Sequence, residues 1–230
     1  MKRVLDIVGA ILGLALGVLI LIPATFAVWL QDGHSPLYFA LRSGRGEKPF
    51  RMIKLRSMRQ RADTSGVNST ASDDPRITPV GRVVRRWKID ELPQLWNVLL
   101  GDMSLVGPRP QVPAEVARYT SEERELLSVK PGITDIASIV FADESDILRG
   151  CPDPDLRYER VIRPWKSRLG LLYVRCGRPL SVDTRILYLT LMHVVARRRA
   201  LAGAARLVRE LGGSEALQKV VRREAAHAFT

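Results

Sequence analysis

Apolar residues fill most of the first 30 positions, from Val4 to Leu30, and Asp6 and Pro23 interrupt them. About 20 apolar residues are enough to cross a bilayer as a helix. The run is too long for a cleaved signal peptide, and no A-x-A cleavage site follows it. Residues 1–31 are therefore predicted to form a membrane helix.

Two features of this segment favour a helix that enters and leaves the membrane on the same face. Lys2 and Arg3 precede the apolar run, and Arg42 and Arg45 follow it. Basic residues on both flanks favour the cytoplasm for both ends. Pro23 removes a backbone donor and is expected to bend the helix. A re-entrant hairpin satisfies both observations, and a straight span is the alternative.

Beyond the membrane segment, the pattern of apolar positions indicates short strands. Residues 34–58 alternate apolar and polar positions around a glycine-rich turn at 43–46. This pattern predicts a β-hairpin with Phe50, Ile53 and Leu55 turned inward.

Helical spacing replaces alternation in the rest of the chain. Asp90 is placed to cap one of these helices, which Gly101 ends. Polar loops are expected over 60–75 and, with a short helix, over 142–158. Helices are predicted over 80–87, over 90–100 with Leu92, Leu95, Trp96 and Leu99 on one face, after a Thr120-x-x-Glu123 capping box, over 181–199 and over 204–226.

The predicted fold is therefore a membrane-associated α/β protein in three parts. A membrane helix over 1–31 precedes a small α/β domain over 32–200, and a basic amphipathic helix follows over 201–230. Basic amphipathic helices in an anchored protein are typical of elements that lie on the membrane surface. The alternative is a solvated charged face whose apolar side packs on the protein's own core.

The charge balance narrows the class of partner. The chain carries 36 Lys and Arg against 24 Asp and Glu, a net charge of +12. Such an excess indicates anionic lipid, nucleic acid or a phosphorylated substrate, but no aromatic and basic pattern supports nucleic-acid binding. The two cysteines form no CxxC pair and are expected to be reduced, and the three histidines lack zinc-site spacing.

The densest candidate chemistry lies around Asp90 and Glu91. Arg85 and Lys88 precede this acidic pair, and Arg109 follows it between two prolines. Prolines stiffen the backbone on both sides of the guanidinium, which suits bidentate binding of a phosphate. Acids in a first helical turn are also common without any catalytic role, because they complement the helix dipole.

Residue chemistry suggests a reaction for this group. Cations around Asp90 are expected to keep its carboxylate ionised at neutral pH. An ionised carboxylate can attack a bound phosphoryl group and form an aspartyl-phosphate intermediate. Glu91 is then the candidate ligand for Mg²⁺, which bridges pyrophosphate oxygens.

Four segments, KPFRMIKLRSM, DDPRITPVGRVVRR, IDELPQLWNVLLGDMSLVGPRP and KPGIT, follow the apolar helix in this order. Together they resemble the bacterial sugar transferase family, the monotopic phosphoglycosyl transferases, from about residue 1 to 200. The resemblance implies a re-entrant membrane helix, a small α/β catalytic domain and interfacial helices at the cytoplasmic face of the bacterial inner membrane. It also implies Mg²⁺-dependent transfer of a sugar 1-phosphate from a nucleotide diphosphate sugar, expected to be a UDP-sugar, to polyprenol phosphate.

The resemblance also implies roles for individual residues. Asp90 matches the nucleophile, Glu91 its Mg²⁺-linked partner, and Pro23 the helix-breaking proline. Phosphate-binding roles are implied for four basic residues: Lys54, Arg56, Arg85 and Arg109. The expected partners also include anionic lipids and exclude nucleic acid, and the chain is expected to start exopolysaccharide, O-antigen or glycoconjugate assembly. Between a monomer and a homodimer the sequence leaves the choice open.

Some positions depart from the family pattern. Ile136 stands where an aromatic residue is usual, residues 141–143 lack a basic residue, and Gly170 stands where an acid is usual. These positions are expected to shape the nucleotide or sugar pocket. They also keep an alternative function open, a catalytically inactive membrane-bound scaffold that binds anionic lipids.

Overall fold

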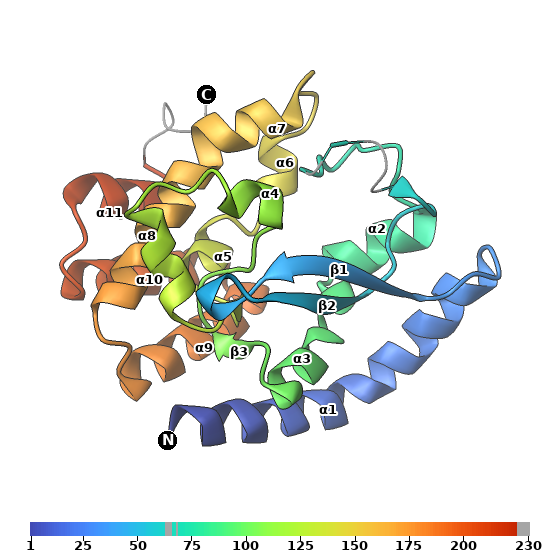
Figure 1. Ribbon diagram of the computed structural model, residues 1–230, viewed down its shortest axis with the longest axis horizontal. Coiled ribbons are helices and arrows are strands. Elements are labelled where there is room, and N and C mark those ends of the chain that lie inside the picture. The colour runs from blue at the N-terminus through green and yellow to red at the C-terminus, as the bar shows by residue number, and fades with distance from the viewer. Residues whose placement is uncertain (63–65, 68, 225–230) are drawn as a thin grey trace.

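The computed structural model describes residues 1–62, 66–67 and 69–224, and its N-terminal segment forms one long helix, α1 (Lys2–Leu30). The helix continues through Pro23 and is bent in Figure 1, where it runs along the lower edge of the molecule. In the described part of the chain it is the one helix long and apolar enough to cross a membrane, and 11% of its most apolar stretch is buried. The membrane-helix prediction agrees with this helix.

The predicted hairpin is confirmed by β1 (Leu37–Ser43) and β2 (Pro49–Leu55), which pair antiparallel over their whole length. The hairpin crosses the middle of Figure 1, above α1. Phe50 and Leu55 are buried as predicted. Met52 lies in the core instead of Ile53, which is half-buried, because Ile53 faces the side of the hairpin on which its neighbour Phe39 is exposed.

A second, two-stranded sheet holds the centre of the domain. Strands β3 (Ser104–Val106) and β4 (Gly132–Thr134) pair in parallel. Between the hairpin and β3 the chain forms α2 (Pro79–Arg86), the 3₁₀ turn η3 (Ile89–Glu91) and α3 (Gln94–Leu100). The other short helical segments are η1 (Arg45–Glu47), α4 (Pro113–Val116), η4 (Glu123–Ser128), α5 (Ile136–Val140), α6 (Glu144–Ile147), α7 (Pro154–Arg157) and η5 (Tyr158–Ile162).

Four longer helices complete the domain: α8 (Arg163–Arg175), α9 (Leu180–Val195), α10 (Arg197–Glu210) and α11 (Glu215–Arg222). The single C-terminal helix predicted over 204–226 is wrong, because a glycine turn at Gly212, with φ of +80°, divides α10 from α11. A Cβ at Gly203 would lie 2.4 Å from Leu189 Cδ2, so α10 packs closely on α9. The apolar sides of α10 and α11 belong to the main core, through Ala204, Leu207, Val208, Leu217, Val220 and Val221.

Of the two helix caps predicted from the sequence, one is present in the structure and one is not. The capping box is confirmed, because Thr120 N donates to Glu123 Oε2 at 3.0 Å and Glu123 N donates to Thr120 Oγ1 at 3.2 Å. Asp90 does not cap a helix: Lys88 adopts a left-handed conformation with φ of +57° and starts the 3₁₀ turn η3. The predicted apolar face is also incomplete, since Trp96 is 53% exposed.

The helix α1 lies against the domain along a face of small residues. A Cβ at Gly9 would come 2.5 Å from Leu105 Cδ1, and one at Gly13 would come 2.9 Å from Leu95 Cδ1. Because glycine has no Cβ, these two positions allow α1 to approach the leucine side chains of the domain closely. Large apolar residues on the rest of the helix remain exposed, including Leu12, Leu16, Leu19, Ile22 and Phe26. That exposed surface is available to lipid.

Polar residues fix the N-terminal end of α1 to the domain. Lys2 Nζ donates to Asp183 Oδ2 at 2.6 Å, and Arg3 donates to two carbonyl oxygens at the C-terminal end of α3. Asp6, which interrupts the apolar run, is 3% exposed and accepts hydrogen bonds from Ser104 Oγ at 2.9 and 3.0 Å. A buried carboxylate is tolerated when its oxygens are paired in this way.

Candidate active site

The acidic pair occupies the 3₁₀ turn η3, between α2 and α3. Asp90 is 6% exposed, and its Oδ1 has no hydrogen-bond partner among the described residues. Glu91 is held by Arg109, whose two terminal nitrogens donate to its carboxylate at 2.6 and 3.0 Å. Lys54 Nζ, from the end of β2, lies 4.0 Å from Glu91 Oε1. The sequence-predicted residues Lys54, Asp90, Glu91 and Arg109 are therefore brought together.

The two neighbouring acids are in opposite electrostatic environments. Burial, and then the charge of Glu91, raises the pKa of Asp90 above its ordinary value, although Lys54 and Arg85 lower it. Burial also acts to raise the pKa of Glu91, but Arg109 and then Lys54 outweigh it and hold that pKa well below its ordinary value. The sequence predicted that nearby cations keep Asp90 ionised, and the structure adds burial, which has the larger effect on its pKa and acts in the opposite direction.

The basic residues of the site are perturbed as well. Burial lowers the pKa of Lys54 to about 8, against the opposing effect of Glu91. The charge of Glu91 raises the pKa of Arg109. Arg109 therefore keeps its charge, while Lys54 is a largely buried cation, 22% exposed at its side chain, that lies near Glu91 and lines the cavity.

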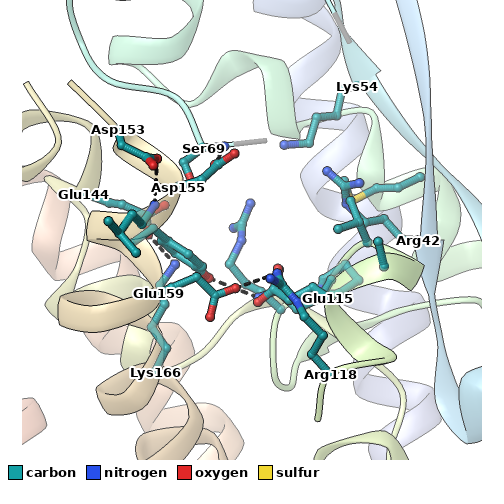
Figure 2. A pocket seen from close by; sticks show the side chains of 18 residues that line it. Arg42, Lys54, Ser69, Glu115, Arg118, Glu144, Asp153, Asp155, Glu159 and Lys166 are labelled. Carbon is teal, nitrogen blue, oxygen red and sulfur yellow. Dashed lines mark hydrogen bonds and ion pairs between the residues drawn. The ribbon is translucent and has the colours of Figure 1, made fainter. Parts of the chain in front are cut away.

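A cavity of about 430 Å³ is lined by Lys54 and Arg109, the two basic residues that contact Glu91, while Asp90 and Glu91 do not themselves line it. Figure 2 shows Lys54 and Arg42 on one side of the cavity and Glu144, Asp153 and Asp155 on the opposite side. Arg42, from β1, was considered in the sequence only as a basic flank of the apolar run and not as a site residue. In the hairpin it lies opposite Phe50 on the neighbouring strand β2, which also carries Lys54, and both basic residues line the cavity.

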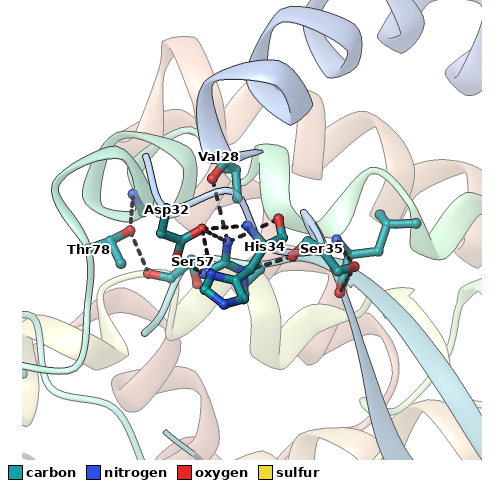
Figure 3. Close-up of polar contacts among 9 residues, drawn as sticks. Val28, Asp32, His34, Ser35, Ser57 and Thr78 are labelled. Atoms are coloured by element: carbon teal, nitrogen blue, oxygen red, sulfur yellow. Dashed lines mark hydrogen bonds and ion pairs between the residues drawn. The ribbon is translucent and has the colours of Figure 1, made fainter. Parts of the chain in front are cut away.

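Arg56 is placed differently from the other predicted phosphate ligands. Its guanidinium donates to both carboxylate oxygens of Asp32, at 2.5 and 2.6 Å, and its Nε donates to Ser35 O at 2.8 Å (Figure 3). Arg56 is 8% exposed, and it holds the pKa of Asp32 at about 2. These contacts connect the C-terminal end of α1 to the end of β2, so the structure does not bring Arg56 into the cavity.

Arg85 remains close to the acidic pair without joining the cavity wall. It lies in the last turn of α2, and its Nη1 lies 3.5 Å from Ser57 Oγ. Its charge acts to lower the pKa of Asp90. Arg85, on α2, therefore favours the ionised form of Asp90 through its charge.

The positions that depart from the family pattern do not line this cavity. Ile136 is 1% exposed in the core, and a Cβ at Gly170 would come 2.8 Å from Leu126 Cδ2. Asp143 accepts hydrogen bonds from Arg197 and Arg223, so the C-terminal helices hold it. These positions therefore contribute no side chain to the wall of this cavity.

The donor set at the site fits a cation that is shared with a bound phosphate. Among the described residues no group of three or more His, Cys, Asp or Glu side chains could hold a metal ion alone. Mg²⁺ is commonly held by one or two carboxylates together with substrate phosphates. Asp90 has an unpartnered buried oxygen, and Glu91 lies beside it.

Both cysteines are free, as predicted.

The chain is similar to proteins of one family over most of its length. The family described as bacterial sugar transferase matches residues 1–197. The chain is 43% identical over 141 residues to a UDP-glucose:undecaprenyl-phosphate glucose-1-phosphate transferase of Caulobacter vibrioides, covering 60% of this chain and 53% of that protein. It is 33% identical over 210 residues to an undecaprenyl-phosphate glucose phosphotransferase of Komagataeibacter xylinus, covering 86% of this chain and 36% of that protein.

A third relative is an undecaprenyl-phosphate galactose phosphotransferase of Salmonella typhimurium, 38% identical over 161 residues, which cover 64% of this chain and 34% of that protein. The chain thus spans about half or less of the length of these three relatives. The family match itself covers most of the chain and includes both the membrane helix and the acidic pair. The chain belongs to the bacterial sugar transferase family.

Proposed function

We propose that this chain is a phosphoglycosyl transferase that moves a sugar 1-phosphate from a nucleotide diphosphate sugar to polyprenol phosphate. The observation that carries the proposal is the buried, unpartnered oxygen of Asp90, next in the chain to Glu91, whose cationic partners Lys54 and Arg109 line the cavity. The relatives include a UDP-glucose:undecaprenyl-phosphate glucose-1-phosphate transferase, which supports a UDP-sugar as the donor.

In the first half-reaction Asp90 acts as the nucleophile. A carboxylate oxygen forms a bond to the β-phosphorus, and the bond from that phosphorus to the oxygen bridging the α-phosphate breaks. The nucleoside monophosphate leaves with the electron pair, and the sugar phosphate remains on Asp90. Lys54 and Arg109 are placed to bind the diphosphate oxygens, which holds the phosphorus near the carboxylate and offsets the developing charge.

In the second half-reaction a phosphate oxygen of the polyprenol phosphate attacks the same phosphorus. The bond between that phosphorus and Asp90 breaks, which restores the carboxylate and releases a polyprenol diphosphate sugar. The exposed apolar surface of α1 supports this step, because a helix with such a surface would hold the domain at the bilayer, where the phosphate of a lipid acceptor lies.

Glu91 is the residue that would hold Mg²⁺, together with the phosphates of the donor. When bound, Mg²⁺ would neutralise charge on the diphosphate as the bond to the leaving group breaks. Arg109 fixes the orientation of the Glu91 carboxylate through two hydrogen bonds. It also keeps that carboxylate ionised, the form that binds a cation.

A re-entrant arrangement of α1 is the topology we favour. Lys2 and Arg3 bind the domain at one end of the helix, and Asp32 binds Arg56 of the same domain just after the other end. A helix that crossed the bilayer would separate its two ends by about 30 Å of hydrocarbon. Attachment of both ends to one domain supports placement of both on one face, and the basic flanks favour the cytoplasmic one.

The full chain in lipid nanodiscs provides the test of this function. It is incubated with undecaprenyl phosphate, Mg²⁺ and, separately, UDP-glucose, UDP-galactose or UDP-N-acetylgalactosamine. We expect release of UMP and formation of a lipid-linked sugar diphosphate from at least one donor, and loss of both with EDTA. Binding to anionic vesicles without release from any donor would instead favour the scaffold function.

Substitution of Lys54 is expected to weaken donor binding, whereas substitution of Arg56 is expected to reduce stability. Lys54→Ala should raise the donor KM about tenfold, since a phosphate contact of a charged group contributes 1.5–3 kcal/mol or so. Arg56→Ala should lower the thermal midpoint of unfolding and leave the donor KM within about twofold, because its partners are Asp32 and Ser35. A tenfold rise in KM for a folded Arg56→Ala variant would restore its predicted phosphate-binding role.

A further inference from the structure

The cavity wall opposite Lys54 is rich in carboxylates, and most of them already have partners. Glu144 pairs with Lys166, and Asp155 accepts a hydrogen bond from Ser69 N at 2.6 Å. Asp153 caps α7, where it accepts from Leu156 N at 2.9 Å, and Glu159 pairs with Arg118 and Arg163. These acids therefore have structural roles in holding the wall together.

Glu115 differs from the other carboxylates that line the cavity. It lies on α4, six residues after Arg109, and it is 9% exposed. Its Oε1 is buried and has no hydrogen-bond partner among the described residues. Buried acceptors in folded proteins are almost always paired. An acceptor left without a donor in the wall of a cavity is a group that a ligand can satisfy.

The surroundings of Glu115 indicate the kind of ligand. Arg42, close enough for its pKa to be affected by Glu115, lines the same cavity with Lys54 and Arg109. A molecule that fills the cavity thus meets cations on one part of its surface and a hydrogen-bond acceptor on another. A nucleotide diphosphate sugar has this distribution, because its diphosphate is anionic and its ribose and transferred sugar present hydroxyl donors.

The size of the cavity and the state of the carboxyl group agree with this assignment. About 430 Å³ lies within the range of small-molecule sites and is enough for a ring that carries several hydroxyls. Burial, and then the charge of Glu159, raises the pKa of Glu115 to about 7. A hydrogen bond from a hydroxyl is therefore favourable to Oε1, which is buried and accepts from none of the donors in the described part of the chain.

We propose that Glu115 is a specificity residue of the donor site, whose Oε1 accepts a hydrogen bond from a hydroxyl of the nucleotide sugar. The proposal rests on the proposed function for the identity of the donor. The hydroxyl can belong to the ribose or to the transferred sugar, and the two sources differ in whether the nucleoside monophosphate alone retains the contact.

Three variants of the full chain in nanodiscs test this role. Glu115→Leu removes the acceptor at similar size, Glu115→Gln keeps an oxygen acceptor, and Glu210→Leu is a control at an exposed residue paired with Arg185. The measurements are steady-state kinetics with the UDP-sugar that the wild type turns over. We expect Glu115→Leu to raise KM about tenfold with kcat within about twofold, and Glu115→Gln and Glu210→Leu to remain within about threefold of wild type for both constants.

Inhibition by UMP distinguishes the two sources of the hydroxyl. A UMP inhibition constant that rises together with KM in Glu115→Leu places the contact on the ribose. An unchanged constant places it on the transferred sugar. A KM within about twofold of wild type in Glu115→Leu would overturn the proposal, as would an equal loss in the Glu210→Leu control.

Direct binding separates failure of this proposal from failure of the proposed function. Equilibrium dialysis of the same UDP-sugar without lipid acceptor should show about tenfold weaker binding to Glu115→Leu, whether or not turnover occurs. Wild-type chain that binds the donor without releasing UMP contradicts the transferase function and leaves this comparison intact. If Glu115→Leu does not fold, Glu115→Ala carries the same comparison, and equal affinities of the folded variants would refute the role of Glu115.

Discussion

Asp90→Asn is expected to abolish UMP release, by about 10⁴-fold or more. The amide has nearly the same shape as the carboxylate, so the loss would report on the nucleophile. Membrane association should remain near normal, because the contacts of α1 involve Lys2, Arg3 and Asp6 and not Asp90. The measurement is UMP release from the active donor, with co-sedimentation of the variant with lipid vesicles.

A matched control keeps this result specific. Asp146→Asn changes an exposed acid that pairs with Arg149 on the surface, and it should retain activity within about twofold of wild type. Mass spectrometry of donor-treated wild type, without acceptor, should find the sugar phosphate on the peptide that contains Asp90. Full activity of Asp90→Asn would refute the covalent mechanism, even with the family assignment unchanged.

Arg109→Ala is expected to destabilise the fold strongly as well as to weaken donor binding. Glu91 is 14% exposed at its side chain, and the variant leaves that carboxylate buried without its bidentate partner. Removing one member of a buried ion pair costs about 3 kcal/mol or more. The expected result is a corresponding fall in the free energy of unfolding, measured by chemical denaturation in EDTA so that no divalent cation replaces the guanidinium.

The stability difference between wild type and Arg109→Ala should depend on pH, because the pKa of Glu91 is lowered in the folded protein. Because the folded-state pKa lies below the ordinary value of 4.5, the wild-type contribution is complete above about pH 4.5 and is lost as the pH falls. The difference between wild type and Arg109→Ala should therefore narrow in acid. The double variant Arg109→Ala, Glu91→Gln should be less destabilised than the sum of the single variants, and strict additivity would show that the two side chains do not interact.

The elements that follow local rules were predictable from the sequence. The β-hairpin follows from alternation around a glycine turn, and the reciprocal hydrogen bonds of Thr120 and Glu123 follow from a four-residue motif. Elements that depend on packing were not. For the C-terminal helix the sequence left membrane-surface placement and packing on the protein's own core both open, and its apolar residues, now on α10 and α11, belong to the core with residues of α8 and α9.

The candidate site shows the same division between local and long-range information. Asp90, Glu91 and Arg109 were predictable because they are clustered in the sequence and belong to long family motifs. Arg56 is close to Lys54 in the sequence, but Asp32 binds its guanidinium and directs it away from the cavity. Arg42 and Glu115 join the cavity only through the hairpin and α4, and a single sequence carries no local signal for either position.

The polar contacts of α1 also constrain the order in which the protein is made. Lys2 and its partner Asp183 are 181 residues apart, and Asp6 and Ser104 are 98 residues apart. At about 5–20 residues per second, a ribosome needs roughly 10 to 40 s to add the 181 residues between the first pair. The apolar helix is therefore synthesised well before the residues that bind it. The domain therefore folds onto a helix that has already been synthesised.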